Sequence, residues 1–158
     1  MEKIKSFTVD HLCLNPGIYE SRRDQVGQGE VVTYDLRITA PNREPVINTG
    51  EVHSIEHLAA TYLRNHPKHK DQIIYFGPMG CRTGFYLLVN ATLSGKDLYE
   101  LIKETFEFIS TFDDEIPGAS AKDCGNYHDN NLPMARWIAL KYLKDLEKIT
   151  DFTFSYKD

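Results

Sequence analysis

The feature that most constrains this chain is the pentapeptide His53-Ser54-Ile55-Glu56-His57, which lies in a stretch with helical periodicity. At about 100° per residue, His57 lies roughly 40° from His53 around a helix axis, and Glu56 lies about 60° to the other side. The apolar side chains of the stretch gather opposite them, at Ile55, Leu58, Ala59 and Tyr62. We therefore expect a helix that packs one side into the core and reserves the other for two imidazoles and a carboxylate.

Two imidazoles one turn apart can bind one cation, and a catalytic metal centre needs a third protein ligand and an open position. The order H-x-x-E-H resembles that of the inverzincin metalloproteases, which take a third ligand from a Glu about seventy to eighty residues downstream. No Glu occurs here between Glu115 and Glu147. The other candidate is Cys124, because two imidazoles and one thiolate suit Zn²⁺ or Fe²⁺. An exposed helix face that binds no metal is the remaining interpretation.

A second thiol, Cys81, lies between two glycines in the segment Pro78-Met79-Gly80-Cys81-Arg82-Thr83-Gly84. The adjacent Arg82 and a nearby dication would favour its thiolate. Because the unperturbed pKa of a thiol is about 8.5, Cys81 is a candidate acid/base group near neutral pH. The alternative is an inert thiol in a turn.

Length and composition indicate one domain over residues 1–158, with enough apolar residues for a core without disulfides. The formal net charge is −5 and no segment concentrates basic residues, so we expect no nucleic-acid partner. The longest apolar runs are far shorter than the roughly 18 residues of a spanning helix, so we expect no membrane partner. No signal-peptide pattern follows Met1, and three cysteines are an odd number for a secreted disulfide framework. We expect a soluble, cytoplasmic protein.

Strands and helices are mixed irregularly along the chain, which favours an α+β fold with a mostly antiparallel sheet packed against helices. Apolar and polar side chains alternate in residues 31–39, which predicts a half-buried strand with Arg37 pointing away from the core. Two further strands are expected at residues 73–76 and 84–93, joined by a tight turn. The tail at residues 152–156 is expected to form a short strand or a docked extension.

Three helices are expected. The first runs from about residue 51 to residue 65 and carries the H-x-x-E-H pattern. The second follows Ser94 as a capping residue, and the third begins at Asn130 or Asn131. Trp137 is expected in the core beneath the third helix.

Several short motifs occur together along the chain: Ser6-Phe7-Thr8-Val9-Asp10-His11, Tyr34-Asp35-Leu36-Arg37, Pro41-Asn42, the H-x-x-E-H pattern, Pro78 to Tyr86, and Cys124-Gly125. In order and approximate spacing these motifs resemble the S-ribosylhomocysteine lyase family, the bacterial enzymes of autoinducer-2 synthesis. The resemblance runs from about residue 4 to residue 140. Because the motifs occur together, they are more specific than any one of them.

The resemblance implies a homodimer with two sites at the subunit interface and one metal ion per subunit. The metal would be Fe²⁺ in the cell and often Zn²⁺ or Co²⁺ after purification. The resemblance also implies that His53, His57 and Cys124 bind the metal, and that Glu56 and Cys81 are the two groups that transfer protons.

Three further residues, Ser6, His11 and Arg37, would contact the substrate, with the two N-terminal residues reaching from the other subunit. The implied reaction cleaves the small molecule S-ribosylhomocysteine to homocysteine and 4,5-dihydroxy-2,3-pentanedione. It proceeds by migration of a carbonyl along the ribose and β-elimination of the thioether.

The sequence departs from the family pattern at two places. Tyr75, Phe76 and Gly77 stand where the family usually carries an acidic residue and a Ser, so the resemblance identifies no partner here for the amino group of homocysteine. Many members have a His at the position of Asn130, whereas here a His stands at His128. Two other functions remain open from the residues alone: a small H-x-x-E-H metallopeptidase, and a metal-stabilised binding module whose fourth coordination position is filled by protein.

Overall fold

The computed structural model describes residues 1–156, so the last two residues of the expected domain lie outside the described part. The strands and helices are β1 (Gly17–Val26), β2 (Gly29–Arg37), α1 (Thr49–Arg64), β3 (Ile73–Pro78), β4 (Gly84–Asn90), α2 (Gly95–Thr111) and α3 (Leu132–Leu146). Short 3₁₀ turns lie at Lys5–Phe7 and Lys70–Gln72. This order confirms the α+β fold class.

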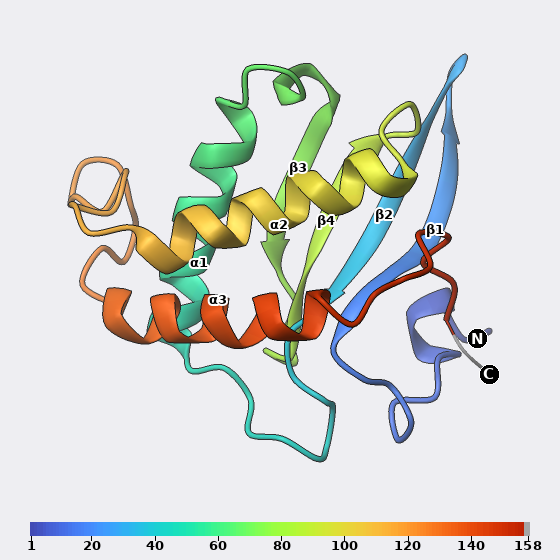
Figure 1. The fold of residues 1–158 in the computed structure, drawn as a ribbon, viewed down its shortest axis with the longest axis horizontal. Coiled ribbons are helices and arrows are strands. Elements are labelled where there is room, and N and C mark those ends of the chain that lie inside the picture. Colours follow the sequence, from blue (N-terminus) through green and yellow to red (C-terminus); the bar gives the residue numbers. More distant parts are fainter. Residues whose placement is uncertain (157–158) are drawn as a thin grey trace.

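The strands form one antiparallel sheet in the order β1-β2-β4-β3 (Figure 1). The sequence predicts β2, β3 and β4 but not β1, whose middle carries the charged residues Glu20, Arg22, Arg23 and Asp24. These residues form ion pairs with one another, Arg23 with Glu20 and Arg22 with Asp24. Charged side chains are typical of an edge strand, where they discourage pairing with another sheet.

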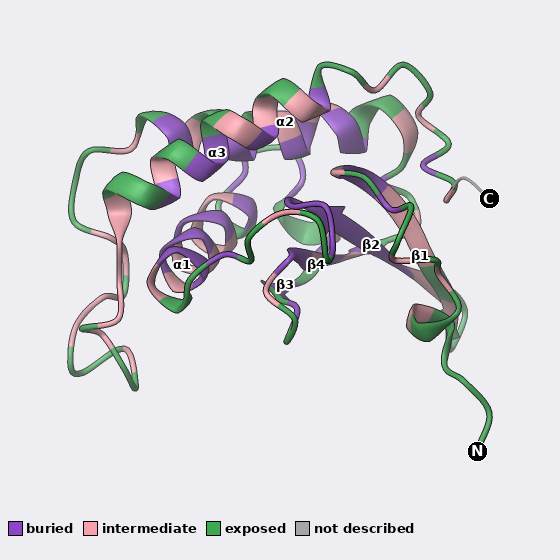
Figure 2. Ribbon diagram, turned by 90° about the horizontal axis from the view of Figure 1, so that it is seen from below, coloured by how far each residue is buried: buried purple, intermediate pink, exposed green. Residues whose placement is uncertain are grey.

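All three helices lie on one side of the sheet. Figure 2 shows α2 and α3 as an outer layer, with α1 beside the edge strand β3. Side chains from every layer are fully buried between them, among them Leu36, Ile55, Phe85, Phe106 and Tyr142. Outside this helical layer, the N-terminal 3₁₀ turn contacts β1, and Tyr156 of the C-terminal tail donates to Asp35 of β2. The molecule therefore has one helical face and one sheet face.

On the sheet face, the side chains of β2 are more deeply buried than the sequence predicts. Asp35 and Arg37 do point away from the main core, but the prediction of a half-buried strand is wrong, because they are only 1% and 3% exposed. Arg37 donates to Asp35 within the strand and to Thr83 in the turn before β4, and the tail residue Tyr156 donates to Asp35. The two opposite charges are thus buried as a pair whose hydrogen bonds are satisfied.

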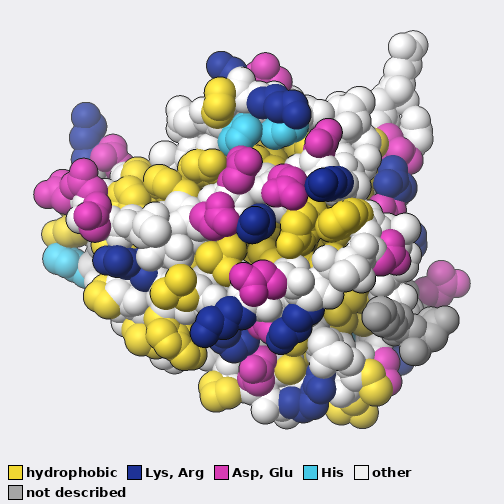
Figure 3. Space-filling model, viewed as in Figure 1, with side chains coloured by type: hydrophobic (Ala, Val, Ile, Leu, Met, Phe, Trp, Pro, Cys, Tyr) yellow, Lys and Arg dark blue, Asp and Glu magenta, His cyan; other side chains and the backbone are white. Residues whose placement is uncertain are grey.

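The three helices occur where the sequence predicts them. The side chain of Asn131 accepts a hydrogen bond from the backbone N–H of Met134 and caps α3, as expected. The prediction for Trp137 is wrong, because α3 turns this residue to the outside with Met134 and Leu140, and its exposed fraction is 56%. The outer face of α2 and α3 mixes acidic and basic side chains with apolar ones (Figure 3). Within residues 1–156, every helix is too short or too polar to cross a membrane.

Candidate metal centre and thiol pocket

The helix α1 uses its two sides as the sequence predicts. Ile55 and Leu58 are completely buried in the core. On the other side, His53, Glu56 and His57 are half-buried. Within residues 1–156, the side chain of Glu56 makes no hydrogen bond or ion pair. Its carboxylate is therefore free to act on a ligand.

Backbone carbonyls from the loop between α2 and α3 fix the ring nitrogens of both histidines. Nδ1 of His53 donates to the carbonyl of Asp129 at 2.7 Å, and Nδ1 of His57 donates to the carbonyl of Pro117 at 2.8 Å. Because a carbonyl can only accept, each Nδ1 carries the hydrogen and each neutral ring keeps its lone pair on Nε2. Such carbonyl contacts orient the histidines of metal sites.

Cys124 supplies a third donor from the same loop. Its Sγ lies 3.3 Å from Nε2 of His53, and the donor atoms of His53, His57 and Cys124 all lie within 4.8 Å of one another. Metal–nitrogen bonds of about 2.0 Å and a metal–sulfur bond of about 2.3 Å place tetrahedral donors roughly 3.3–3.6 Å apart. The three donors lie close enough together for one divalent cation to draw them into this geometry. Among the described residues no glutamate joins it, so the metallopeptidase interpretation is not favoured.

The loop that carries these contacts is held against α1 around the buried Ser54. Its hydroxyl donates to Oδ1 of Asn130 at 3.0 Å and accepts from the backbone N–H of Asn131 at 2.9 Å. Further along the loop, Gly118 has a φ of +74°, and a Cβ added there would lie 3.3 Å from Nδ1 of His57. Glycine permits both the backbone conformation and the close approach.

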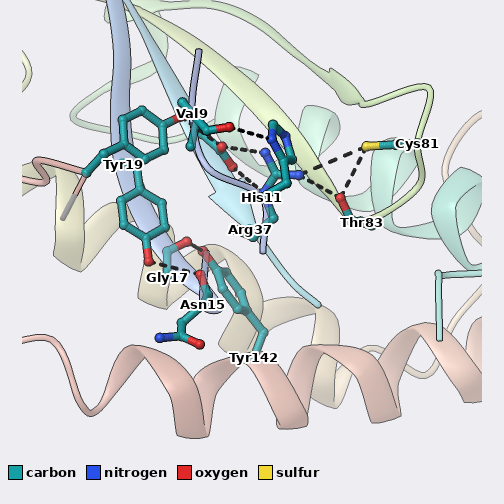
Figure 4. Close-up of polar contacts among 11 residues, drawn as sticks. Val9, His11, Asn15, Gly17, Tyr19, Arg37, Cys81, Thr83 and Tyr142 are labelled. Carbon is teal, nitrogen blue, oxygen red and sulfur yellow. Dashed lines mark hydrogen bonds and ion pairs between the residues drawn. The ribbon is translucent and has the colours of Figure 1, made fainter. Parts of the chain in front are cut away.

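Four other residues singled out by the sequence, Ser6, His11, Arg37 and Cys81, line a separate pocket of about 490 Å³. Figure 4 shows Arg37 directed at Cys81 and Thr83, with His11 beside it. Nδ1 of His11 donates to the carbonyl of Val9 at 2.8 Å, which leaves the lone pair of Nε2 for a ligand. The pocket therefore combines a thiol, a cation and an imidazole.

The thiol of Cys81 has two polar neighbours. Its Sγ lies 3.2 Å from the hydroxyl of Thr83 and 4.0 Å from Nη1 of Arg37. Partial burial raises the pKa of Cys81, but hydrogen bonds from Thr83 and the positive charge of Arg37 outweigh it, so the net shift is downward. The predicted neighbour Arg82 does not serve this purpose, because its Nη1 donates to the carbonyl of Ile47.

Sequence reasoning missed the residues that support this arginine. Asp35 accepts from Nε and Nη2 of Arg37 at 3.1 and 2.6 Å, and Thr83 accepts from Nη1 at 2.6 Å. Burial lowers the pKa of Arg37 but the charge of Asp35 raises it by more, so the guanidinium stays charged. The i, i+2 spacing of Asp35 and Arg37 in an alternating strand was the available signal.

The triad and the thiol pocket do not share a wall in this chain, since the residues that line the pocket include neither His53, His57 nor Cys124. The pocket opens on the sheet face, where Tyr86 belongs both to it and to a neighbouring pocket lined by Ile4, Tyr75 and Leu88. The described residues thus contain two separate features of interest, a candidate metal centre and a pocket with a thiol whose pKa is lowered.

Comparison with known proteins identifies the family of the chain. The S-ribosylhomocysteinase (LuxS) family matches residues 4–152. A protein named S-ribosylhomocysteine lyase from Finegoldia magna is 57% identical over the whole of both chains. Proteins of the same name from Phocaeicola vulgatus and Clostridium acetobutylicum are 54% and 51% identical, over 99% and 100% of this chain and 98% and 100% of theirs. The chain belongs to the S-ribosylhomocysteinase family.

Proposed function

We propose that the protein cleaves S-ribosylhomocysteine to homocysteine and 4,5-dihydroxy-2,3-pentanedione, the precursor of autoinducer-2. The observation that carries this proposal is the convergence of His53, His57 and Cys124 in a chain whose whole length matches lyases of that name. Three unpaired cysteines support a reducing compartment, for which we propose the cytoplasm.

The triad would hold the metal, and the N₂S donor set supports Fe²⁺, with Zn²⁺ or Co²⁺ as substitutes. When bound, the cation supplies Lewis-acid polarisation of a sugar carbonyl, which acidifies the neighbouring C–H bond. The lone pairs of His53 and His57 are kept on Nε2 by the loop carbonyls, so the histidines need no rearrangement to bind it.

Cys81 and Glu56 would move the protons. As a thiolate, Cys81 can remove a proton from a sugar carbon, and as a thiol it can return one, and the unpaired carboxylate of Glu56 can do the same on the other side of the sugar. Successive transfers move the carbonyl from C1 to C3. The C4 proton is then acidic, and its removal expels the thioether sulfur from C5 as homocysteine.

We infer that the working site is shared between two copies of the chain. The metal triad and Glu56 would come from one copy, and Ser6, His11, Arg37 and Cys81 from the other. Support for this comes from the pocket lining, which lacks the triad, and from the sheet face, where Phe7 and Tyr75 are 68% and 50% exposed. A homodimer that covers this face would bury these side chains and exclude water from the sugar.

The direct test is to incubate anaerobically purified protein with S-ribosylhomocysteine and to titrate the thiol that is released. We expect catalytic release with the protein metallated and none after the metal is removed by a chelator. Protein without substrate corrects for its own three cysteines. A fully metallated protein that releases no thiol would contradict the proposal.

The role of Glu56 has its own test. Glu56→Gln keeps the shape of the side chain and leaves the triad intact, so metal content should stay unchanged while thiol release falls by about 10²–10⁴-fold. Glu100→Gln, on the outer helix α2, is the matched control and should retain the full rate. A near-normal rate for Glu56→Gln would remove this residue from the chemistry.

A further inference from the structure

The C-terminal tail contacts Asp35, the ion-pair partner of the pocket residue Arg37. Phe154 is 4% exposed, and its carbonyl accepts from the backbone N–H of Glu20 at 2.7 Å. The ring of Tyr156 stacks on that of Tyr19, with centroids 4.8 Å apart and planes 4° from parallel. The family match covers residues 4–152, so Phe154 and Tyr156 lie beyond it.

The hydroxyl of Tyr156 donates to Oδ2 of Asp35 at 2.9 Å. The same oxygen accepts from Nη2 of Arg37 at 2.6 Å. Burial and the neighbouring carboxylate of Asp35 raise the pKa of Tyr156, which keeps its hydroxyl protonated and able to donate. Two donors therefore converge on one carboxylate oxygen in an almost completely buried position.

The opposite edge of the same guanidinium meets the reactive thiol. Nη1 of Arg37 donates to Thr83 and lies 4.0 Å from Sγ of Cys81 (Figure 4). Because a guanidinium is planar and rigid, fixing Nε and Nη2 on Asp35 also fixes the direction of Nη1. We propose that Tyr156 is a positioning residue that acts through Asp35 to hold Arg37 against Cys81, so that the tail supports the thiol on which the proposed function depends.

Loss of the Tyr156 hydroxyl should weaken this support in two ways. The carboxylate of Asp35 would lose the bond that fixes its orientation, and Arg37 could turn away from the sulfur. The carboxylate of Asp35 would also lose one hydrogen-bond donor, so its negative charge would be less well compensated. It would then offset more of the attraction between Arg37 and the thiolate of Cys81. Both changes disfavour the thiolate of Cys81. The other titratable side chains that line the pocket are His11, Glu44 and Tyr86, which no variant alters.

The test is the pH profile of iodoacetamide alkylation at Cys81 in the full-length metallated protein, followed by mass spectrometry of the peptide that contains it. Tyr156→Phe keeps the stacking on Tyr19 and removes only the hydroxyl. We expect the profile to move to higher pH, with about three-fold slower alkylation at pH 7, the change that half a pKa unit produces. No substrate is present, so the result does not depend on lyase activity.

Two further variants serve as a positive and a negative control for this measurement. Thr83→Val removes the hydroxyl that directly faces the sulfur and should shift the profile at least as far. Tyr19→Phe also removes a tyrosine hydroxyl, but one that donates to the carbonyl of Asn15, and should leave the profile unchanged. A folded Tyr156→Phe protein with the profile of the unmodified chain would overturn the proposal, as would an equal shift in Tyr19→Phe.

Discussion

Single hydrogen bonds decide which atoms of this protein can act on a ligand. His53, His57 and His11 each donate from Nδ1 to a backbone carbonyl, so each presents an unprotonated Nε2. In the first two this nitrogen faces the triad, and in His11 it is left for the thiol pocket. In the proposed function, the same kind of side chain would therefore bind the metal at His53 and His57 and accept a hydrogen bond from the substrate at His11.

At Cys124, removal of one sulfur should abolish the metal centre. Cys124→Ala leaves two imidazoles, one donor fewer than a catalytic site normally requires. We expect loss of metal after dialysis, measured by elemental analysis of the purified variant. The control is Cys13→Ala, which removes an exposed thiol and should keep the metal. Full metal content in Cys124→Ala would show that another group supplies the third ligand.

At Cys81, a substitution should abolish turnover without removing the metal. Cys81→Ala removes a thiol that lies outside the triad, so metal content should stay unchanged while turnover falls by about 10²–10⁴-fold, the usual contribution of a positioned acid/base group. In the unmodified protein, the pKa of Cys81 is lowered. Alkylation of its thiolate should therefore begin at a lower pH than alkylation of a cysteine in an unstructured peptide. If Cys81→Ala lost both its metal and its turnover, Cys81 would be a metal ligand instead.

Among the elements, the loop between α2 and α3 contributes to the candidate metal centre together with α1. It supplies Cys124 and both carbonyls that orient the histidines, and Ser54 ties it to α1. Gly118 is the point of closest approach, next to Pro117, whose carbonyl accepts from His57. The loop is thus a part of the site even though most of its residues touch no ligand.

This gives a prediction for Gly118→Ala. A φ of +74° costs an alanine about 1–2 kcal/mol, and the new methyl group would press on His57. We expect Zn²⁺ affinity to fall by about 10–100-fold, as for other changes that disturb a ligand's orienting partner, measured by competition with a chelator. Gly27→Ala is the matched control, because Gly27 has a φ of +60° and open space around it. It should lower stability by a similar amount and leave Zn²⁺ affinity unchanged.

The sequence predicts the elements that have strong local patterns and misses those that depend on distant partners. Periodicity locates α1, the cap at Asn131 locates the start of α3, and the alternation in residues 31–39 locates β2. The edge strand β1 has no apolar alternation in its charged part and was missed. Burial of the Asp35–Arg37 pair was also missed, because its partners are distant in sequence. Thr83 is 46 positions from Arg37, and Tyr156 is 121 positions from Asp35.

For the site, spacing was informative wherever one element supplies the residues. His53, Glu56 and His57 share a helix face that the sequence predicts. The choice of Cys124 over a glutamate could be argued from the sequence and is supported by the geometry. The arginine beside Cys81 could not be found this way, because Arg82 is adjacent in sequence while Arg37 is adjacent in space.

Viewed as a whole, the molecule has two unlike faces. The helical face mixes charges of both signs with apolar side chains (Figure 3), whereas the sheet face holds the thiol pocket and the exposed side chains of Ile4, Phe7 and Tyr75. A two-fold interface brings the same patch of both subunits together, so it would place two thiol pockets and two triads symmetrically. In the proposed function, the triad and the thiol pocket of one chain then need partners from the other.

Mixing two inactive variants tests this arrangement. Cys81→Ala carries an intact triad, and Cys124→Ala carries an intact thiol pocket. If each working site takes its triad from one copy and its thiol from the other, a mixed dimer has one intact site and one doubly defective site. Random exchange of subunits at equal concentrations makes half of the dimers mixed, so activity should rise from near zero to about a quarter of that of the unmodified protein. If both groups come from the same copy, every site in the mixture keeps one defect and the activity stays near zero.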